Sequence, residues 1–233
     1  MRAPDQHRPV LLSALVLLVL LAFRLQGQTP HQPKVSPGPD EPDWKVVLAE
    51  RYGLSLFGDL RNPVMTTAIA TPGLFRKAGP GPVTYTPAIA LGLKTRNRGG
   101  WYLPAADGGQ PRKSALWTYT FKNTDDDLKT GKNLPPPLEE GSQTRFDPGD
   151  QPFGLWVSND DFKDGGVFTE PALVARINKR LARQPYKAMI YPNRHKTTGR
   201  LIPNSYLIGW EYSTNDDFQD VVCQVDNVEL LEK

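Results

Sequence analysis

The sequence predicts an all-β fold: a jelly-roll-like antiparallel β-sandwich with one amphipathic helix and long loops. The chain contains 20 glycines and 23 prolines among 233 residues. These residues separate short runs that are rich in Val, Ile, Thr, Tyr, Phe and Trp, which is typical of strands joined by turns. Many short strands with spaced turns favour a sandwich or jelly roll over a parallel α/β sheet.

The first segment, residues 1–27, has the pattern of a signal peptide or signal anchor. Arg2 and Arg8 precede an apolar run over residues 10–23, which is shorter than the roughly 20 residues that a membrane-spanning helix needs. Arg24, directly after this run, is unusual for a cleaved signal. We therefore expect an exported protein that is periplasmic, cell-surface or extracellular, and that contacts a membrane only through this segment if it stays uncleaved.

The remainder divides into a linker and one domain. Residues 28–43 contain five prolines and no apolar cluster, as in a semi-rigid linker. Residues 44–233 have the length of a single β-sandwich domain. Its candidate strands are 45–49, 64–70, 83–93, 116–122, 153–157, 188–191, 206–212 and 218–228.

One helix is predicted after Thr169, which can act as its N-cap. Glu170 suits the positive end of the helix dipole, and Pro171 fits the first turn. Apolar residues then recur at helical spacing, while basic residues fill the other face and Pro185 ends the helix. We expect the apolar stripe, Leu173, Val174, Ile177 and Leu181, to pack on the sandwich. Residues 125–149 are predicted to form a long loop.

The charge distribution says more than the net charge of +3. No acidic residue lies between Glu170 and Glu211, whereas eight lysines and arginines do. Internal pairing of this segment with acidic loops, or a solvated face, is one explanation. Docking onto an anionic glycan is another. No nucleic-acid partner is expected, because no recognition module accompanies the charge.

Cysteine and histidine usage limits the chemistry. Cys223 is the only cysteine, so the core or a metal must stabilise an exported chain that has no internal disulfide. It shares a strand face with Val221 and Val225, and we expect it to be buried. His195 is the only histidine after the linker, which excludes a multi-histidine metal site within one chain. The motifs G-x-S-x-G and H-E-x-x-H and a glycine-rich phosphate loop are absent.

An acidic turn between two apolar runs, 206–210 and 218–225, is the best candidate site. Calcium takes six to eight oxygen ligands, and a turn at a strand junction can bring carboxylates and carbonyls to one point. The alternative is an acidic Asx-type turn that is capped by backbone amides. The candidate calcium ligands are Glu211, Asn215, Asp216, Asp217 and Asp220.

A polysaccharide-active enzyme is the competing class of function. Glycosidases use two carboxylates on either side of the scissile bond, and Glu170 with Glu211 would be the candidate pair. Exposed aromatic side chains would then stack on sugar rings, although aromatic residues in a sandwich of this size are more often core. The candidates are Trp101, Tyr102, Trp117, Trp156 and Trp210.

The segment 153–228 resembles a C-terminal module of secreted bacterial proteins. The resemblance lies in PFGLWVSNDDF, VFTEPALV and the closing NSYLIGWEYSTNDDFQDVV. That family of domains of unknown function implies a β-sandwich at the envelope or outside the cell, often attached to carbohydrate-related or cell-surface proteins. By this resemblance Glu211, Asp217 and Asp220 are the signature acids. We therefore expect a binding or structural module, with a glycan or an envelope component as its partner.

Overall fold

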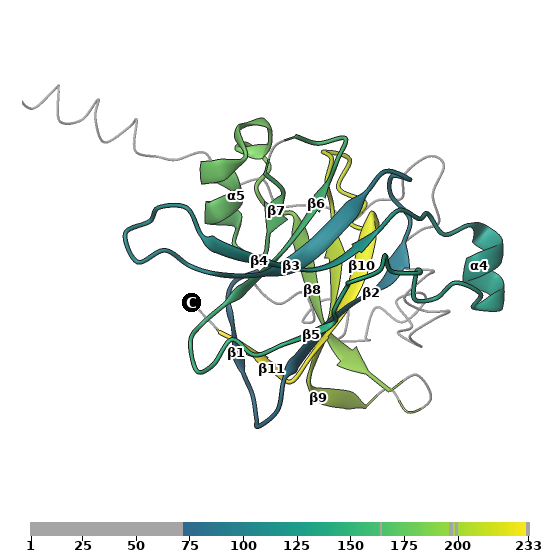
Figure 1. Cartoon of the computed structure of the whole chain (residues 1–233), viewed down its shortest axis with the longest axis horizontal. Coiled ribbons are helices and arrows are strands. Elements are labelled where there is room, and N and C mark those ends of the chain that lie inside the picture. Colours follow the sequence, from purple (N-terminus) through teal and green to yellow (C-terminus); the bar gives the residue numbers. More distant parts are fainter. Residues whose placement is uncertain (1–71, 164, 196–197, 199, 232–233) are drawn as a thin grey trace, which may run out of the picture. The chain divides into compact units, whose positions relative to one another are not determined.

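Antiparallel strands make up most of the regular structure in the computed structural model, which describes residues 72–163, 165–195, 198 and 200–231 (Figure 1). The predicted signal segment, the linker and the candidate strands 45–49 and 64–70 lie outside the described residues. Within the described part, no helix has the length and apolar character needed to cross a membrane.

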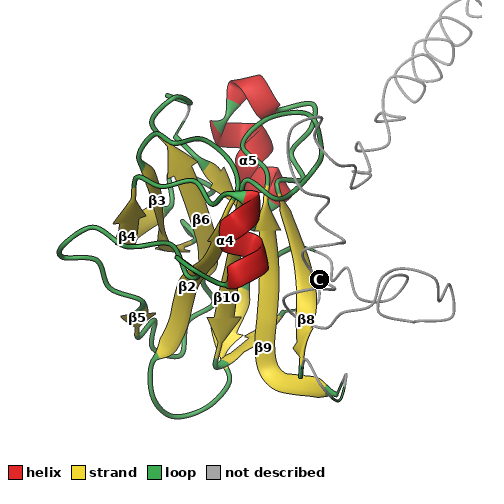
Figure 2. Cartoon of the chain, turned by 90° about the vertical axis from the view of Figure 1, so that its right-hand side faces the viewer, coloured by secondary structure: helices red, strands yellow, loops and turns green. Residues whose placement is uncertain are grey.

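Two sheets form the layers of the sandwich (Figure 2). The five-stranded sheet has the order β5-β2-β10-β9-β8, and the four-stranded sheet has the order β4-β3-β6-β7. All the ladders are antiparallel, so the predicted all-β sandwich is confirmed. The first sheet contains β2 (Val83–Ala90), β5 (Arg145–Phe146), β8 (Ala188–Arg194), β9 (Leu201–Trp210) and β10 (Val221–Asp226). The second contains β3 (Asn97–Leu103), β4 (Arg112–Tyr119), β6 (Gly154–Asn159) and β7 (Val167–Phe168), while β1 (Phe75–Lys77) pairs with β11 (Val228–Leu230).

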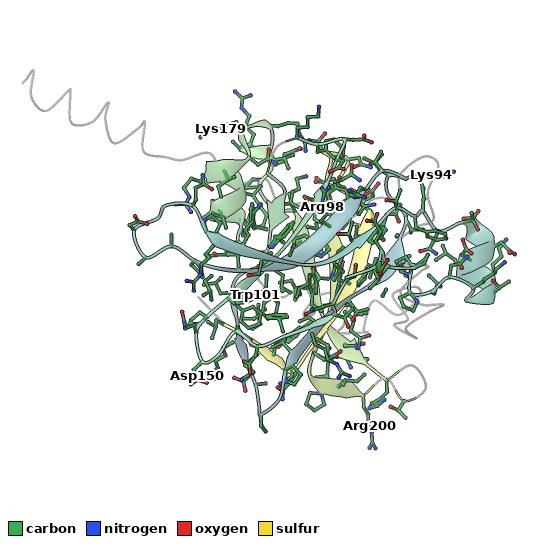
Figure 3. All side chains as sticks on the ribbon, viewed as in Figure 1. Lys94, Arg98, Trp101, Asp150, Lys179 and Arg200 are labelled. Atoms are coloured by element: carbon green, nitrogen blue, oxygen red, sulfur yellow. The ribbon has the colours of Figure 1, made fainter. Side chains whose placement is uncertain are left out.

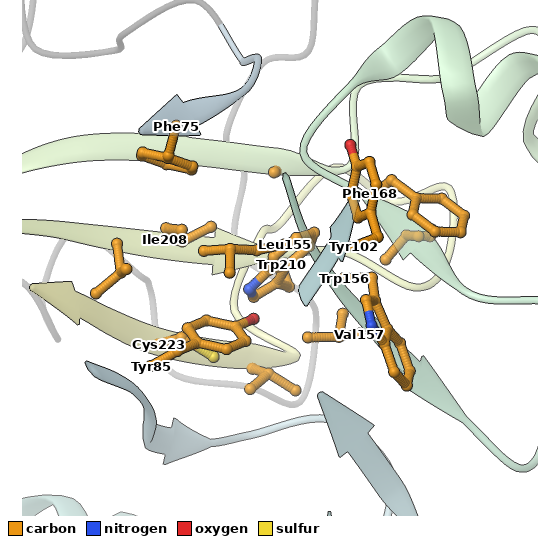
Figure 4. Close-up of a cluster of buried hydrophobic side chains, with 14 of the residues drawn as sticks. Phe75, Tyr85, Tyr102, Leu155, Trp156, Val157, Phe168, Ile208, Trp210 and Cys223 are labelled. Atoms are coloured by element: carbon orange, nitrogen blue, oxygen red, sulfur yellow. The ribbon is translucent and has the colours of Figure 1, made fainter. Parts of the chain in front are cut away.

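The larger of two buried apolar clusters among the described residues lies between the facing sides of the two sheets and is rich in aromatic rings (Figure 4). Tyr85 and Trp117, which come from opposite sheets, have ring centroids 5.6 Å apart. Cys223 is fully buried, as predicted from its strand face. Burial raises the pKa of its thiol to about 12, so the thiol is neutral at physiological pH and acts as a small core side chain.

Strand β3 is one that the sequence pattern misses, because two adjacent glycines interrupt its apolar run. The structure shows why glycine is needed there. A Cβ at Gly99 would lie 2.0 Å from Cζ2 of Trp117, a distance that no side chain can accept. The glycines therefore allow close packing of β3 against β4, where single-sequence rules indicate a turn.

The predicted helix is shorter than expected. Helix α5 covers Pro171–Ile177, and a 3₁₀ turn, η1 (Lys179–Leu181), follows it. Thr169 is not the N-cap, because its hydroxyl accepts a hydrogen bond from the Leu155 N–H at 3.1 Å instead. The apolar stripe does pack on the sandwich, since Leu173, Val174 and Leu181 are buried; Ile177 is partly buried against the same core.

A second helix corrects the prediction of a continuous loop over 125–149. Helix α4 (Asp125–Thr130) begins with a reciprocal capping box between Thr124 and Asp127 and ends at Gly131 in the left-handed conformation. The Thr124 N–H donates to Oδ2 of Asp127 at 2.8 Å, which satisfies a donor that a helix N-terminus leaves open.

The Asp127→Asn variant is expected to destabilise the protein in a pH-dependent way. The Thr124 N–H, the largest influence, and the Asn133 amide hold the pKa of Asp127 below its ordinary value of 3.8. A carboxyl with a depressed folded-state pKa stabilises the fold above its unfolded-state pKa, and this contribution is lost as the pH falls through the folded value. Thermal unfolding should show a Tm lower by about a few degrees at neutral pH. The difference in Tm between the variant and the parent should disappear as the pH falls below 3.8.

Asp125→Asn is the matched control, since Asp125 lies in the same first turn but is exposed. A constant difference in Tm between Asp127→Asn and the parent at every pH would contradict the capping role of the carboxylate.

Candidate metal centre

The acidic turn lies where neighbouring strands of the five-stranded sheet end side by side. Trp210 at the end of β9 is paired with both Ala188 of β8 and Val221 of β10. The residues just beyond these positions, Lys187 and Glu211, therefore lie opposite each other, and the Glu211 N–H donates to the Lys187 carbonyl at 3.1 Å. The antiparallel register thus brings together groups that are far apart in the sequence.

Three of the five predicted ligands come together. One carboxylate oxygen from each of Glu211, Asp217 and Asp220 lies within 4.8 Å of the others. Glu211 and Asp217 are buried, and Asp220 is half-buried. Asn215 is exposed and donates its side-chain N–H to Asp217, so it lies beside the trio, whereas Asp216 faces Lys187 and does not join the three carboxylates.

Glu211 organises the backbone of the turn. Its Oε1 accepts the Ser213 N–H at 2.5 Å, and its Oε2 accepts the N–H groups of Asp217 at 3.0 Å and Phe218 at 3.4 Å. This is the amide capping that the alternative interpretation predicted. It does not exclude a metal, because a carboxylate has about four lone-pair positions.

Asp220 ties the turn to its neighbours. Its Oδ2 accepts the Tyr212 N–H at 2.6 Å, and its carbonyl accepts the N–H groups of Leu91 at 3.1 Å and Gly92 at 2.8 Å. A Cβ at Gly92 would lie only 2.8 Å from Oδ1 of Asp220. Position 92, two residues beyond the end of β2, must therefore lack a side chain for the carboxylate to occupy this position.

Lys187 is a buried member of the cluster that sequence reasoning did not single out. Its side chain is fully buried, Nζ donates to the Ser213 carbonyl at 2.5 Å, and Nζ lies 3.9 Å from Oδ1 of Asp216. Burial lowers the pKa of Lys187, while Glu211, Asp216 and Asp220 act to raise it. The sequence feature that could have identified Lys187 is the segment between Glu170 and Glu211, which contains basic but no acidic residues. For Lys187, the predicted internal pairing with an acidic loop is confirmed.

The carboxyl group of Glu211 lies in an unfavourable electrostatic environment. Burial raises the pKa of Glu211, and the nearby Asp220 carboxylate raises it further, whereas a hydrogen bond at Asp217 and the Lys187 charge oppose the rise. A buried carboxyl group with a raised pKa gains from a bound cation, because the cation offsets the unfavourable burial of charge. The trio of Glu211, Asp217 and Asp220 could therefore hold a metal ion.

The geometry gives no support to the alternative enzyme with a Glu170–Glu211 pair. Glu211 is fully buried, and backbone N–H groups occupy both of its carboxylate oxygens. Glu170 accepts a hydrogen bond from the Tyr102 hydroxyl at 3.0 Å. Trp117, Trp156 and Trp210 are buried, as is Tyr102, and Trp101 is partly buried and stacked on Phe146. These rings belong to the core rather than to a platform for sugar rings.

The fold and the site together define an antiparallel β-sandwich with a buried acidic cluster at one end of its larger sheet. Comparison of the chain with known proteins gave no matching family model, no matching curated protein and no matching solved structure. Its function is therefore inferred from its own residues.

Proposed function

We propose that this protein is an exported binding or structural module of the bacterial envelope or the extracellular space, stabilised by calcium bound at the closing turn. The observation that supports the calcium site most strongly is the trio of Glu211, Asp217 and Asp220, two of them buried and one half-buried, with carboxylate oxygens within 4.8 Å of one another. The charged and apolar pattern of residues 1–27 supports export.

The donor set favours calcium over other metals. Only oxygen donors converge in the trio, and no His or Cys side chain belongs to it. Zinc prefers nitrogen and sulfur ligands, and magnesium demands near-ideal octahedral geometry, whereas calcium accepts six to eight oxygens in an adaptable arrangement. Waters would supply the ligands beyond the three carboxylates.

A glycan or an envelope component is the ligand that we propose for this module. Leu201, at 53% exposure, is the one large hydrophobic side chain that is exposed among the described residues. A single exposed apolar residue does not mark an apolar docking site, so the support for a glycan or an envelope component comes from the resemblance of residues 153–228 to modules of carbohydrate-related or cell-surface proteins.

Calcium is expected to raise the Tm of metal-free protein, and EDTA is expected to lower it again. A ligand that binds only the folded state adds about 2.7 kcal/mol at 100 times its Kd. The double variant Asp217→Ala, Asp220→Ala should abolish the shift. Asp160→Ala, which removes an exposed acid that pairs with Arg98 in another loop, should retain it. Equal Tm values for the parent with calcium and with EDTA would contradict the metal site.

A further inference from the structure

A hollow of about 470 Å³ lies on the outer face of the five-stranded sheet, between β2, β10 and the loop after α4. Its size falls in the range of small-molecule sites, roughly 300–1,000 Å³. One side is apolar and comes from Ala88, Ile89, Leu134 and Pro135. The other side is polar and comes from Thr86, Gln224 and Asp226.

Hydrogen bonds from three neighbours hold the Asp226 carboxylate in place. Oδ1 accepts the Ser205 hydroxyl at 2.5 Å, Oδ2 accepts the Thr84 hydroxyl at 3.0 Å, and Nε2 of Gln224 lies 3.1 and 3.0 Å from the two oxygens. Ser205 also accepts from Nδ2 of Asn193 at 2.9 Å, so its own proton points to Asp226. The acceptor is therefore preorganised by side chains on four adjacent strands.

The Asp226 carboxylate can accept a further hydrogen bond, and no positively charged side chain among the described residues forms an ion pair with it. A carboxylate has about four lone-pair positions, and three side chains donate to this one. None of the described residues that line the hollow is a lysine, arginine or histidine, and no ion pair to Asp226 is present in the described part of the chain. A ligand with a positive group complements this charge.

The apolar side of the hollow is held firmly against the sheet. Asn123 exchanges hydrogen bonds with Ala90 of β2, through its backbone N–H at 2.6 Å and its side-chain Oδ1 at 2.8 Å. Its Nδ2 donates to the carbonyl of Asn133 at 3.1 Å, directly before Leu134. The hollow thus needs little ordering when a ligand binds, which favours affinity.

We propose that this hollow binds an amino sugar, with the sugar ammonium at Asp226. The hydroxyls of the sugar hydrogen-bond to Thr86 and to the carbonyl oxygen of Gln224, whose Nε2 is already committed to Asp226. The C–H face of the ring packs on Leu134 and Pro135. This assignment rests on the proposed carbohydrate-binding function and names its site and its class of ligand.

Calorimetric titration of the full chain with a glucosamine trisaccharide and with its N-acetylated counterpart tests the assignment. The free amine should bind at least about tenfold more tightly than the acetylated form, and Asp226→Asn should remove that difference. Thr86→Trp should abolish binding by filling the hollow while it leaves Asp226 unchanged. Asp150→Asn is the control, because it removes an exposed acid in a distant loop (Figure 3) and should change nothing.

The outcomes separate the site from the broader function. Equal affinity for the two trisaccharides, or amine binding that survives both substitutions in folded variants, overturns the amino-sugar site but leaves carbohydrate binding elsewhere. Absence of binding to either sugar overturns the site, and absence of binding on a wider glycan array also overturns the carbohydrate function. The calcium-dependent Tm, measured separately, tests the metal centre alone.

Discussion

Lys187→Met is expected to lower the free energy of unfolding of the metal-free protein by about 3–5 kcal/mol, the usual loss when one partner of a buried ion pair is removed. Methionine retains most of the apolar stem but not the ammonium. The Asp216 carboxylate, 3.9 Å away, and its neighbour Glu211 would then be buried without their internal cation. Urea denaturation in EDTA measures this loss.

Added calcium should restore part of the lost stability, because a bound cation replaces some of the missing positive charge. Lys179→Met is the matched control: Lys179 is exposed on η1 (Figure 3), and its replacement should cost no more than about 0.5 kcal/mol. A Lys187→Met variant as stable as the Lys179→Met control would show that the ammonium does not balance the acidic cluster.

Glu211→Ala should lower the free energy of unfolding by about 3 kcal/mol or more, because each buried N–H that loses its acceptor costs about 1–3 kcal/mol. The side chain accepts from Ser213, Asp217 and Phe218. Two residues of this turn, Asp216 with φ of 61° and Phe218 with φ of 55°, also adopt the left-handed conformation, which is costly without such support.

Glu211→Gln separates the capping role from the charge. The side-chain carbonyl oxygen of glutamine can still accept the N–H groups that one of the two carboxylate oxygens of Glu211 accepts. We therefore expect Glu211→Gln to lower the free energy of unfolding, measured with denaturant, by less than Glu211→Ala does. Both variants should lose the calcium-dependent increase in Tm if the carboxylate is a ligand. Unfolding of Glu211→Ala at the same denaturant concentration as the parent would contradict the role of Glu211 in holding the turn.

Local patterns were sufficient to predict the class of fold. The alternation of Val221, Cys223 and Val225 predicts a half-buried strand, and the structure buries all three on the inner face of β10. The clustering of acids after residue 210 likewise marks the turn correctly, because oxygen-bearing side chains at a strand junction are visible in the sequence. The sequence pattern did not distinguish Glu211, Asp217 and Asp220, whose carboxylates converge, from Asp216, which faces Lys187.

Some features were missed because their cause is not local. The glycines of β3 resemble a turn until Trp117 is seen to pack against Gly99. Helix α4 is only six residues long, too short for a clear hydrophobic period. The Asp226 hollow needs β2, β9 and β10 side by side, together with a loop that is distant in the chain.

The sequence by itself determined the all-β class, the burial of Cys223 and the position of the acidic turn, since each depends on side-chain alternation or on neighbours within a few residues. Tertiary structure alone decided which acids meet and which cation balances them. Lys187 and Glu211 lie 24 residues apart in the chain, and they meet because the antiparallel register pairs Ala188 with Trp210. Strand register is set by the packing of the whole sheet. The residues that meet at the ends of neighbouring strands therefore cannot be identified from local sequence alone.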